Sequence, residues 1–186
     1  AELQGWFPDK FLYRTDRDGF DYVYSVDDLA DLKGRKFQKK RNHVNRFRAE
    51  HPHFELQTLT RSNLPAAQHM VGEWYRDRMQ ADPTGDYMLE SIALSRALRH
   101  YEGLRMESAV LVEDGEILAL TMGSRLWPDT FDIHFEKARE DVDGAYAAVN
   151  CEFARYLRLK YPDLRYLNRE DDVGLAGLRK AKLSYN

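Results

Sequence analysis

The sequence predicts an α+β fold, a three-layer sandwich in which helices cover both faces of one mixed sheet. Two kinds of pattern predict it. Short runs in which apolar and polar residues alternate indicate strands, and longer stretches with apolar residues three or four positions apart indicate helices. Consecutive strand runs separated by tight turns predict an antiparallel meander. A long helix then leads to one further strand, as in a parallel crossover connection.

The first half of the chain is expected to hold an aromatic segment, several helices and one strand. Residues 1–24 are rich in aromatic side chains and favour extended structure. Ser25 and Ser62 are expected to begin helices, because a serine hydroxyl can accept hydrogen bonds from free N–H groups. Further helices are expected over the basic segment that ends near residue 51 and over 87–101, the latter with Met88, Ile92, Leu98 and Tyr101 inward. The alternating run 53–60 predicts the strand.

The second half is expected to begin with the meander. Its three strands are predicted at 108–112, 117–122 and 130–136, the last with strict alternation. A helix over 144–160, a short strand over 164–167 and a last helix over 174–182 complete the prediction.

The composition is that of an ordinary globular protein. The 186 residues include 28 Lys and Arg against 31 Asp and Glu, for a net charge of −3. The single cysteine, Cys151, excludes an intramolecular disulfide and a cysteine-rich zinc site. The sequence shows no apolar run of about 20 residues and no signal peptide, so we expect a cytoplasmic location, with peripheral attachment to a membrane as an alternative.

The positive charge is concentrated in one segment. Residues 33–48 carry 8 Lys and Arg and no acidic residue, which leaves 20 basic against 31 acidic residues elsewhere, or −11. Such a segment favours a phosphate-bearing partner: nucleic acid, a lipid headgroup or a cofactor. The candidate phosphate-binding residues are Lys39, Lys40, Arg41 and Arg46. The alternative is a solvated helix face, the common fate of charged runs.

Three long stretches, 36–47, 134–154 and 168–182, together resemble a known family. The order of elements is similar to the acyltransferase fold of the Gcn5-related N-acetyltransferases. The three stretches resemble the bacterial family related to the C-terminal domain of phosphatidylglycerol lysyltransferase. Members resemble two acyltransferase-like lobes in tandem. The resemblance therefore implies that residues 1–50 are the end of a first lobe with a basic connecting helix, and that 51–186 are a second domain lacking its C-terminal end.

The expected donor is an aminoacyl-tRNA rather than an acyl-CoA. In acetyl-CoA users of this superfamily, a Gln/Arg-x-x-Gly-x-Gly/Ala loop holds the pyrophosphate on backbone N–H groups. Here the corresponding residues 141–146 place Asp141 at the cationic position and Tyr146 at the last small one, so carboxylates would repel a pyrophosphate. The ammonium group of an aminoacyl donor would suit these acids, and its tRNA would suit the basic segment. Helix capping is the alternative role for the acids.

The candidate catalytic residues are His134 and Glu136. Both are expected on one face of the strand 130–136, opposite Phe131, Ile133 and Phe135, where an imidazole or a carboxylate could accept a proton. The alternative is that this face is simply exposed to solvent. The candidate substrate-binding residues are polar groups on the long helix or directly after the last strand: Asn150, Asn168, Arg169, Glu170 and Asp171. Each has a structural alternative, a buried hydrogen bond for the first and loop or cap contacts for the others.

We therefore expect an acyl- or aminoacyl-transferase that acts on an amine or hydroxyl acceptor such as a lipid headgroup. No cofactor or metal is expected to be required. Two alternatives remain open at this point. One is a non-catalytic module that binds RNA or an anionic membrane, and the other is a CoA-dependent N-acetyltransferase.

Overall fold

One mixed sheet forms the centre of the molecule. The computed structural model describes residues 2–185. The sheet has six strands in the order β1-β6-β5-β4-β3-β2, in which only the β5–β6 pair is parallel. The predicted α+β architecture with its meander is thus confirmed. The strands are β1 Val23–Ser25, β2 Glu55–Thr58, β3 Glu107–Glu113, β4 Glu116–Trp127, β5 Thr130–Ala138 and β6 Tyr166–Asn168.

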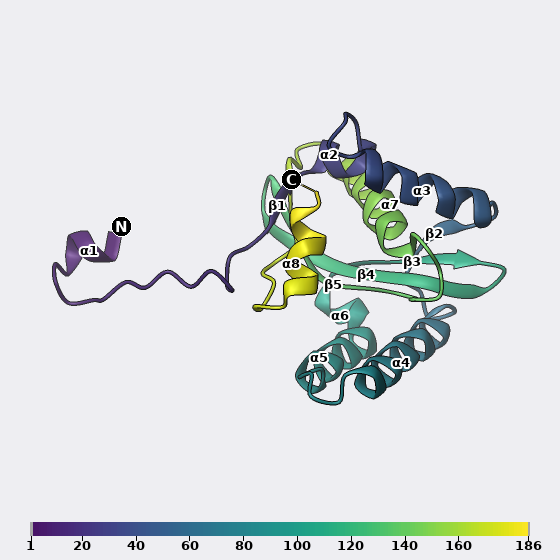
Figure 1. The fold of residues 1–186 in the computed structure, drawn as a ribbon, viewed down its shortest axis with the longest axis horizontal. Helices are drawn as coiled ribbons and strands as arrows, with labels where there is room; N and C mark the ends of the chain where they lie inside the picture. The colour runs from purple at the N-terminus through teal and green to yellow at the C-terminus, as the bar shows by residue number, and fades with distance from the viewer. Residues whose placement is uncertain (1, 186) are drawn as a thin grey trace.

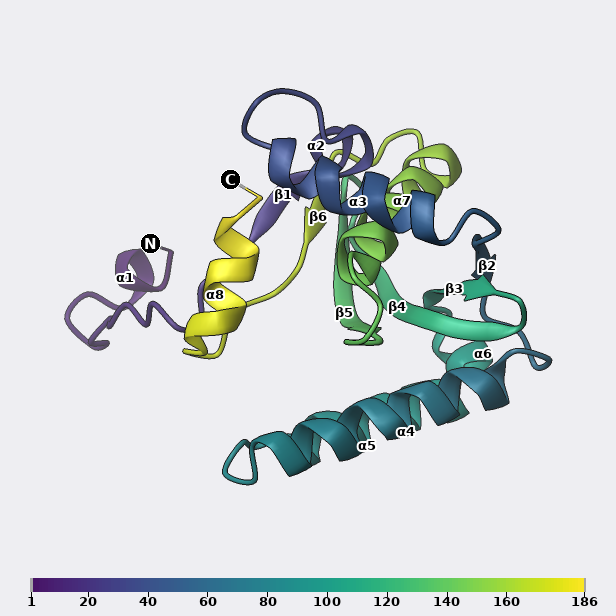
Figure 2. The same ribbon diagram turned by 45° about the vertical axis from the view of Figure 1, so that its right-hand side comes forward.

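Helices cover both faces of this sheet. On one face lie α2 (Val26–Asp31), α3 (Gln38–Glu50) and α7 (Ala145–Lys160), and on the other lie α4 (Leu64–Ala81) and α5 (Met88–Arg99) (Figure 1). The short α6 (Tyr101–Leu104) follows α5, and α8 (Ala176–Leu183) lies near the β1 end of the sheet (Figure 2). The α1 turn (Glu2–Trp6) sits at the end of an arm that extends away from the body.

The basic helix α3 is held to the body by its apolar face. Phe37, Val44 and Phe47 are at most 2% exposed, as their spacing predicts, and Phe47 packs in the cluster beneath α7. The packing is close at Gly144, because a Cβ there would lie 2.6 Å from the carbonyl oxygen of His43. Burial of these apolar side chains holds α3 in position, and this does not depend on any ligand of its basic side chains.

Residues 22–50 share the sheet and the core of residues 51–186. β1 pairs with β6, and Leu29 of α2 is fully buried in the cluster that contains Phe153 of α7. The sequence predicts that residues 1–50 are the end of a first lobe. This stays a prediction, because a segment that was once part of another lobe could also pack into this core.

Several local predictions are wrong. Met88 and Ile92 are 65% and 41% exposed, because α5 begins at the end of a hairpin that extends past the strands (Figure 2). The cap position of α4 is held by Asn63 rather than Ser62, whose hydroxyl bonds to Thr60 instead. Ser25 does precede α2, but its side chain makes no capping hydrogen bond.

Candidate active site

A β-bulge in β5 sets the direction of the candidate catalytic side chains. The pairing of β4 with β5 shifts by one residue after Ile133, which leaves His134 as an extra residue. The expected strict alternation is therefore wrong. Phe131 packs on α7, and Glu136 also bonds to α7 through Asn150, so the two lie on the same face of the sheet rather than on opposite faces. His134 bonds to Ser124, which alternates along β4 with Leu120 and Met122 on the face covered by α4 and α5. The expectation that His134 and Glu136 share one face is therefore wrong as well.

Glu136 and Arg169 form a largely buried ion pair. Arg169 Nη2 donates to Glu136 Oε1 at 2.6 Å, and the two side chains are only 14% and 10% exposed. Asn150 Nδ2 donates to the other carboxylate oxygen at 3.2 Å. Burial is the largest single effect and lowers the pKa of Arg169, but the charges of Glu136, Tyr185 and Tyr24 and the hydrogen bond to Glu136 together outweigh it and raise the pKa of the guanidinium. Three predicted site residues are thus brought together, Glu136 from β5, Arg169 from the position directly after β6 and Asn150 from α7.

Lys40 and Tyr185 extend this pair towards α3. The Lys40 Nζ atom lies 4.2 Å from the centre of the Tyr185 ring, and the Arg169 guanidinium lies 5.3 Å from the same centre. Burial and then the charge of Arg169 lower the pKa of Lys40, while burial raises the pKa of the Tyr185 hydroxyl. We call these five residues the Glu136 cluster: Glu136, Arg169, Asn150, Lys40 and Tyr185. Two cations against one carboxylate make it positive, which suits an anion.

Two buried oxygen atoms lie beside the carboxylate of this cluster. Asn150 is 4% exposed and Thr121, the partner of Glu136 across β4 and β5, is 0% exposed. Asn150 Oδ1 and Thr121 Oγ1 have no hydrogen-bond partner among the described residues. Buried polar atoms are usually bonded, so these oxygens favour a bound donor group, of water or of a substrate.

The loop after β6 is held by a buried lysine. Lys182 Nζ of α8 donates to the carbonyl oxygens of Arg169, Glu170 and Asp171, and the contact with Glu170 is 3.1 Å. Burial and then the charge of Arg169 lower the pKa of Lys182. Asn168 Nδ2 donates to Asp21 at 2.9 Å, and its Oδ1 accepts from the Glu170 N–H at 3.0 Å. The contacts of Asn168 are therefore those of the loop itself, while Asp171 remains half-buried.

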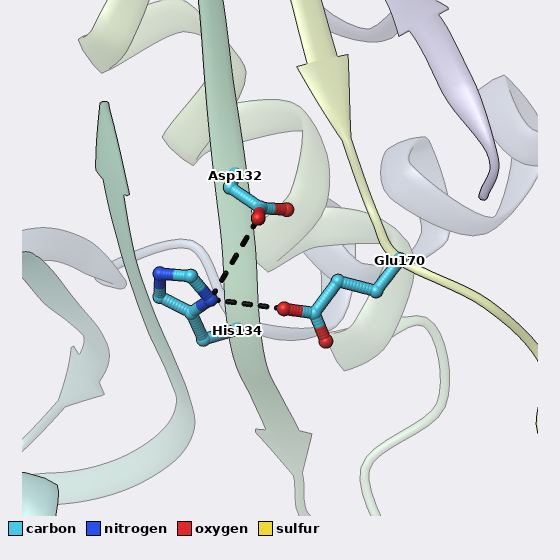
Figure 3. Close-up of side chains that lie close together, drawn as sticks. All are labelled: Asp132, His134 and Glu170. Carbon is cyan, nitrogen blue, oxygen red and sulfur yellow. Dashed lines mark hydrogen bonds and ion pairs between the residues drawn. The ribbon is translucent and has the colours of Figure 1, made fainter. Parts of the chain in front are cut away.

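His134 lies in a separate chain of hydrogen bonds. Its Nδ1 atom lies 2.9 Å from Glu170 Oε1 and 4.0 Å from Asp132 Oδ2 (Figure 3). Its Nε2 atom lies 2.8 Å from the hydroxyl of Ser124 on β4. The hydrogen bond with Glu170 raises the pKa of His134 against the effect of burial. Burial, and then the charge of Glu170, raise the pKa of Asp132.

The same three side chains have the donor set of a metal site. One ligand atom from each of Asp132, His134 and Glu170 lies within 4.8 Å of the other two. One imidazole and two carboxylates suit zinc or manganese. The contacts with Glu170 and Ser124 satisfy both nitrogens of the imidazole, whereas the buried Asp132 Oδ1 has no hydrogen-bond partner among the described residues. The expectation that no metal is required stays a prediction.

The predicted phosphate-binding residues differ in their surroundings. Arg41 Nη1 donates to the carbonyl oxygens of Leu32 and Gly34 at 2.6 and 3.1 Å, which closes the end of α2. Arg46 pairs with Asp143. Lys39 is exposed, and within residues 2–185 it has no ion pair. Only Lys40 joins the Glu136 cluster, so a role in phosphate binding stays a prediction for all four.

The acidic start of α7 and the basic helix α3 meet directly. Asp143 contacts Arg46 and lies 3.5 Å from His43. The two neighbouring acids are also paired with cations, Asp141 with Arg139 at 2.7 Å and Glu140 with Arg78. These acids are therefore neutralised within the fold. Their expected attraction for a free ammonium group is weakened accordingly.

Sequence reasoning missed Ser124, Thr121, Lys182 and Tyr185. Ser124 and Thr121 lie in an apolar strand, where a hydroxyl carries no pattern of its own. Lys182 had a detectable signal, since it lies in the stretch 168–182 that carries the family resemblance. The role of Tyr185 depends on how α8 folds back, and no local spacing predicts that.

A protein-family model described as the C-terminal domain of phosphatidylglycerol lysyltransferase matches residues 3–186. The chain belongs to this family. A search of curated proteins finds no match. No helix among the described residues is long and apolar enough to cross a membrane.

Solved structures share the fold of this lysyltransferase family. A conserved protein of unknown function from Bacteroides thetaiotaomicron VPI-5482 is 40% identical, with a TM-score of 0.91 over 100% of this chain and 61% of that one. L-PGS from Bacillus licheniformis is 18% identical, with a TM-score of 0.65 over 99% and 61%. A C-terminal domain of the DUF2156 class from Agrobacterium fabrum is 17% identical, with a TM-score of 0.54 over 85% and 48%. The chain thus spans about three fifths of the length of the proteins from Bacteroides thetaiotaomicron and Bacillus licheniformis.

Proposed function

We propose that the chain transfers an aminoacyl group from a phosphate-bearing carrier, an aminoacyl-tRNA, to a hydroxyl or amine acceptor such as a phospholipid headgroup. The observation that carries the proposal is the Glu136 cluster. It places two cations, a carboxylate and an unpaired amide oxygen together in a largely buried part of the sheet. Membership of the phosphatidylglycerol lysyltransferase family supports the class of reaction.

The charges of the cluster suit both parts of such a substrate. Lys40 and Arg169 provide positive charge for a phosphate of the carrier. Asn150 Oδ1 offers an acceptor to an ammonium or hydroxyl group. A purely nucleic-acid-binding surface would not need a buried carboxylate and amide beside its cations.

The proton acceptor in this proposal is His134, which lies on the other face of the sheet from the Glu136 cluster and is linked to it through the consecutive residues Arg169 and Glu170. Both oxygens of Glu136 already accept hydrogen bonds, from Arg169 and Asn150, so its carboxylate holds the neighbouring side chains in place. His134 faces Ser124 through Nε2 while Glu170 holds Nδ1, which is the arrangement of a base and the group that orients it. Nε2 would take the proton of the hydroxyl that attacks the ester carbonyl, and that proton would pass to the leaving oxygen.

The test is transfer of labelled lysine from lysyl-tRNA to phosphatidylglycerol vesicles, with acetyl-CoA as the competing donor. The proposal predicts labelled lipid with wild type, and a loss of at least about 100-fold for H134Q, the range that positioned proton transfer contributes. Transfer of acetyl groups from acetyl-CoA in place of lysine, or equal rates for H134Q and wild type, would reject it.

A further inference from the structure

We propose that Ser124 is a nucleophile that carries the acyl group as a transient ester. The inference rests on the proposed transferase function and names a step within it. Ser124, His134 and Glu170 form a continuous chain of hydrogen bonds: Ser124 Oγ to Nε2 at 2.8 Å, then Nδ1 to Glu170 Oε1 at 2.9 Å. A hydroxyl, a base and a carboxylate that orients the base are the recurring parts of an activated serine.

The fold holds the base in this direction. His134 is the extra residue of the β-bulge, and bulges re-aim a side chain relative to the regular strand. Glu170 follows the parallel neighbour β6 and is fixed by its own backbone contacts with Asn168 and Lys182. With Nδ1–H donated to Glu170, Nε2 is the nitrogen that can accept the proton of the serine hydroxyl.

The nucleophile is within reach of a substrate. Ser124 is half-buried, and the next residues of β4, from Arg125 to Trp127, are exposed. His134 is 25% exposed on its side chain. The hydroxyl therefore lies where the strand passes from the core to the surface, so an ester can approach it from solvent.

The chemistry is a two-step exchange without a further reactant. Ser124 Oγ bonds to the carbonyl carbon of the donor ester as its proton moves to His134 Nε2, and the bond from that carbon to the carrier oxygen breaks as the oxygen takes the proton. In the second step the acceptor hydroxyl gives its proton to Nε2 and bonds to the same carbon. The serine oxygen then leaves and recovers the proton.

The test uses p-nitrophenyl acetate, a small activated ester, with intact-mass and peptide-mass measurement on the chain. Wild type is expected to gain one acetyl group on the peptide that contains Ser124, and S124A is expected to gain none there. S91A is the matched control, since Ser91 is half-buried like Ser124 and its hydroxyl donates to the carbonyl of Met88, and it should behave as wild type. E170Q should slow acetylation by about 100-fold or more and shift its pH profile, because Glu170 orients the base.

Absence of acetyl on the Ser124 peptide of wild type, or an unchanged rate in E170Q, would overturn the inference. If S124A fails to fold, S124C replaces it. The thiol should then react with iodoacetamide faster than in the double variant S124C/E170Q, and equal rates would overturn the inference.

Failure of this step is distinguishable from failure of the proposed function. Lysyl transfer at the wild-type rate by folded S124A would overturn the covalent step and leave the transferase intact. Acetylation of Ser124 without lysyl transfer would overturn the transferase function and leave the activated serine intact.

Discussion

Arg169 Nη2 lies 2.6 Å from Glu136 Oε1, although 33 positions separate the two residues in the sequence. Glu136 belongs to β5 and Arg169 directly follows β6, the parallel neighbour of β5. The crossover through α7 is what brings them together, and α7 also supplies Asn150. The central charges of the candidate site therefore depend on the topology of the sheet.

Removing one partner of this pair should destabilise the fold. R169A leaves Glu136 buried without its counter-charge, which typically costs about 3–5 kcal/mol. The double variant E136Q/R169M removes both charges and should recover much of that loss. Urea unfolding of the two variants checks the prediction. Equal midpoints for R169A and wild type would mean that the pair contributes nothing.

The Lys40 ammonium should contribute to donor binding more than its exposed neighbour does. K40A is expected to weaken binding of labelled lysyl-tRNA by about 10-fold or more, because a charged hydrogen bond is worth roughly 1.5–3 kcal/mol. K39A removes the same charge from an exposed position and should change affinity by about 2-fold or less. Fluorescence anisotropy at one fixed salt concentration measures both. Similar losses in the two variants would indicate non-specific attraction instead.

The pH dependence of His134 follows from its contact with Glu170. The raised pKa of His134 means that its contact with Glu170 adds stability below the ordinary pKa of 6.5, and that this stability is lost as pH rises through the folded value. E170Q should return the pKa towards 6.5, as measured by NMR titration of the ring protons. E73Q, which alters the exposed pair with His69, is the control and should leave His134 unchanged. A wild-type value at or below 6.5 contradicts the prediction.

Acid should unfold the chain partly through Asp172. Its carboxylate accepts hydrogen bonds from Arg179, at 2.6 and 2.8 Å, and from the Tyr22 hydroxyl at 2.5 Å. The contact with Arg179 holds the pKa of Asp172 below its usual 3.8, so the stabilisation is complete above that value and is lost as pH falls further. D172N should lower Tm at pH 7, and the difference from wild type should shrink in acid. A Tm difference that does not change with pH would contradict this assignment.

The contact of α3 with α7 should depend on the absence of a side chain at Gly144. This residue has φ +81°, and an added Cβ would meet the His43 carbonyl. G144A is therefore expected to cost about 1–3 kcal/mol. Gly177 in α8 has open space around it, so G177A should be neutral or stabilising by about 0.5–1 kcal/mol. Thermal unfolding compares the two, and an equal effect would contradict the packing described here.

Periodicity and turn chemistry predicted most of the fold. The meander, α7 and the buried face of α3 follow patterns that are local in the sequence. The bulge at His134 follows no such pattern. Residues 131–136 alternate between apolar and polar in the sequence, so nothing in that alternation marks His134 as the extra residue. The error reversed the face assigned to Glu136, and only pairing with β4 reveals it.

The candidate site was predicted only in part, because local sequence patterns place residues on elements but do not give their tertiary contacts. Asn150 and Arg169 were selected from their positions on α7 and after β6, and the structure joins both to Glu136. The partners of Arg41 and Arg46 could not be foreseen, since their charge patterning says nothing of the carbonyl groups and Asp143 that the fold brings to them. Tertiary contacts therefore decide which cations of a basic segment remain available.

The central claim is that the Glu136 cluster serves aminoacyl transfer. Its most direct measurement is the rate of lysyl transfer from lysyl-tRNA to phosphatidylglycerol for R169K compared with wild type and with K39A. R169K keeps the charge but loses the planar donor group that meets Glu136, so we predict a large loss of kcat/KM in R169K and little change in K39A. Wild-type rates in a folded R169K, or no lysyl transfer by the unaltered chain, would contradict the account.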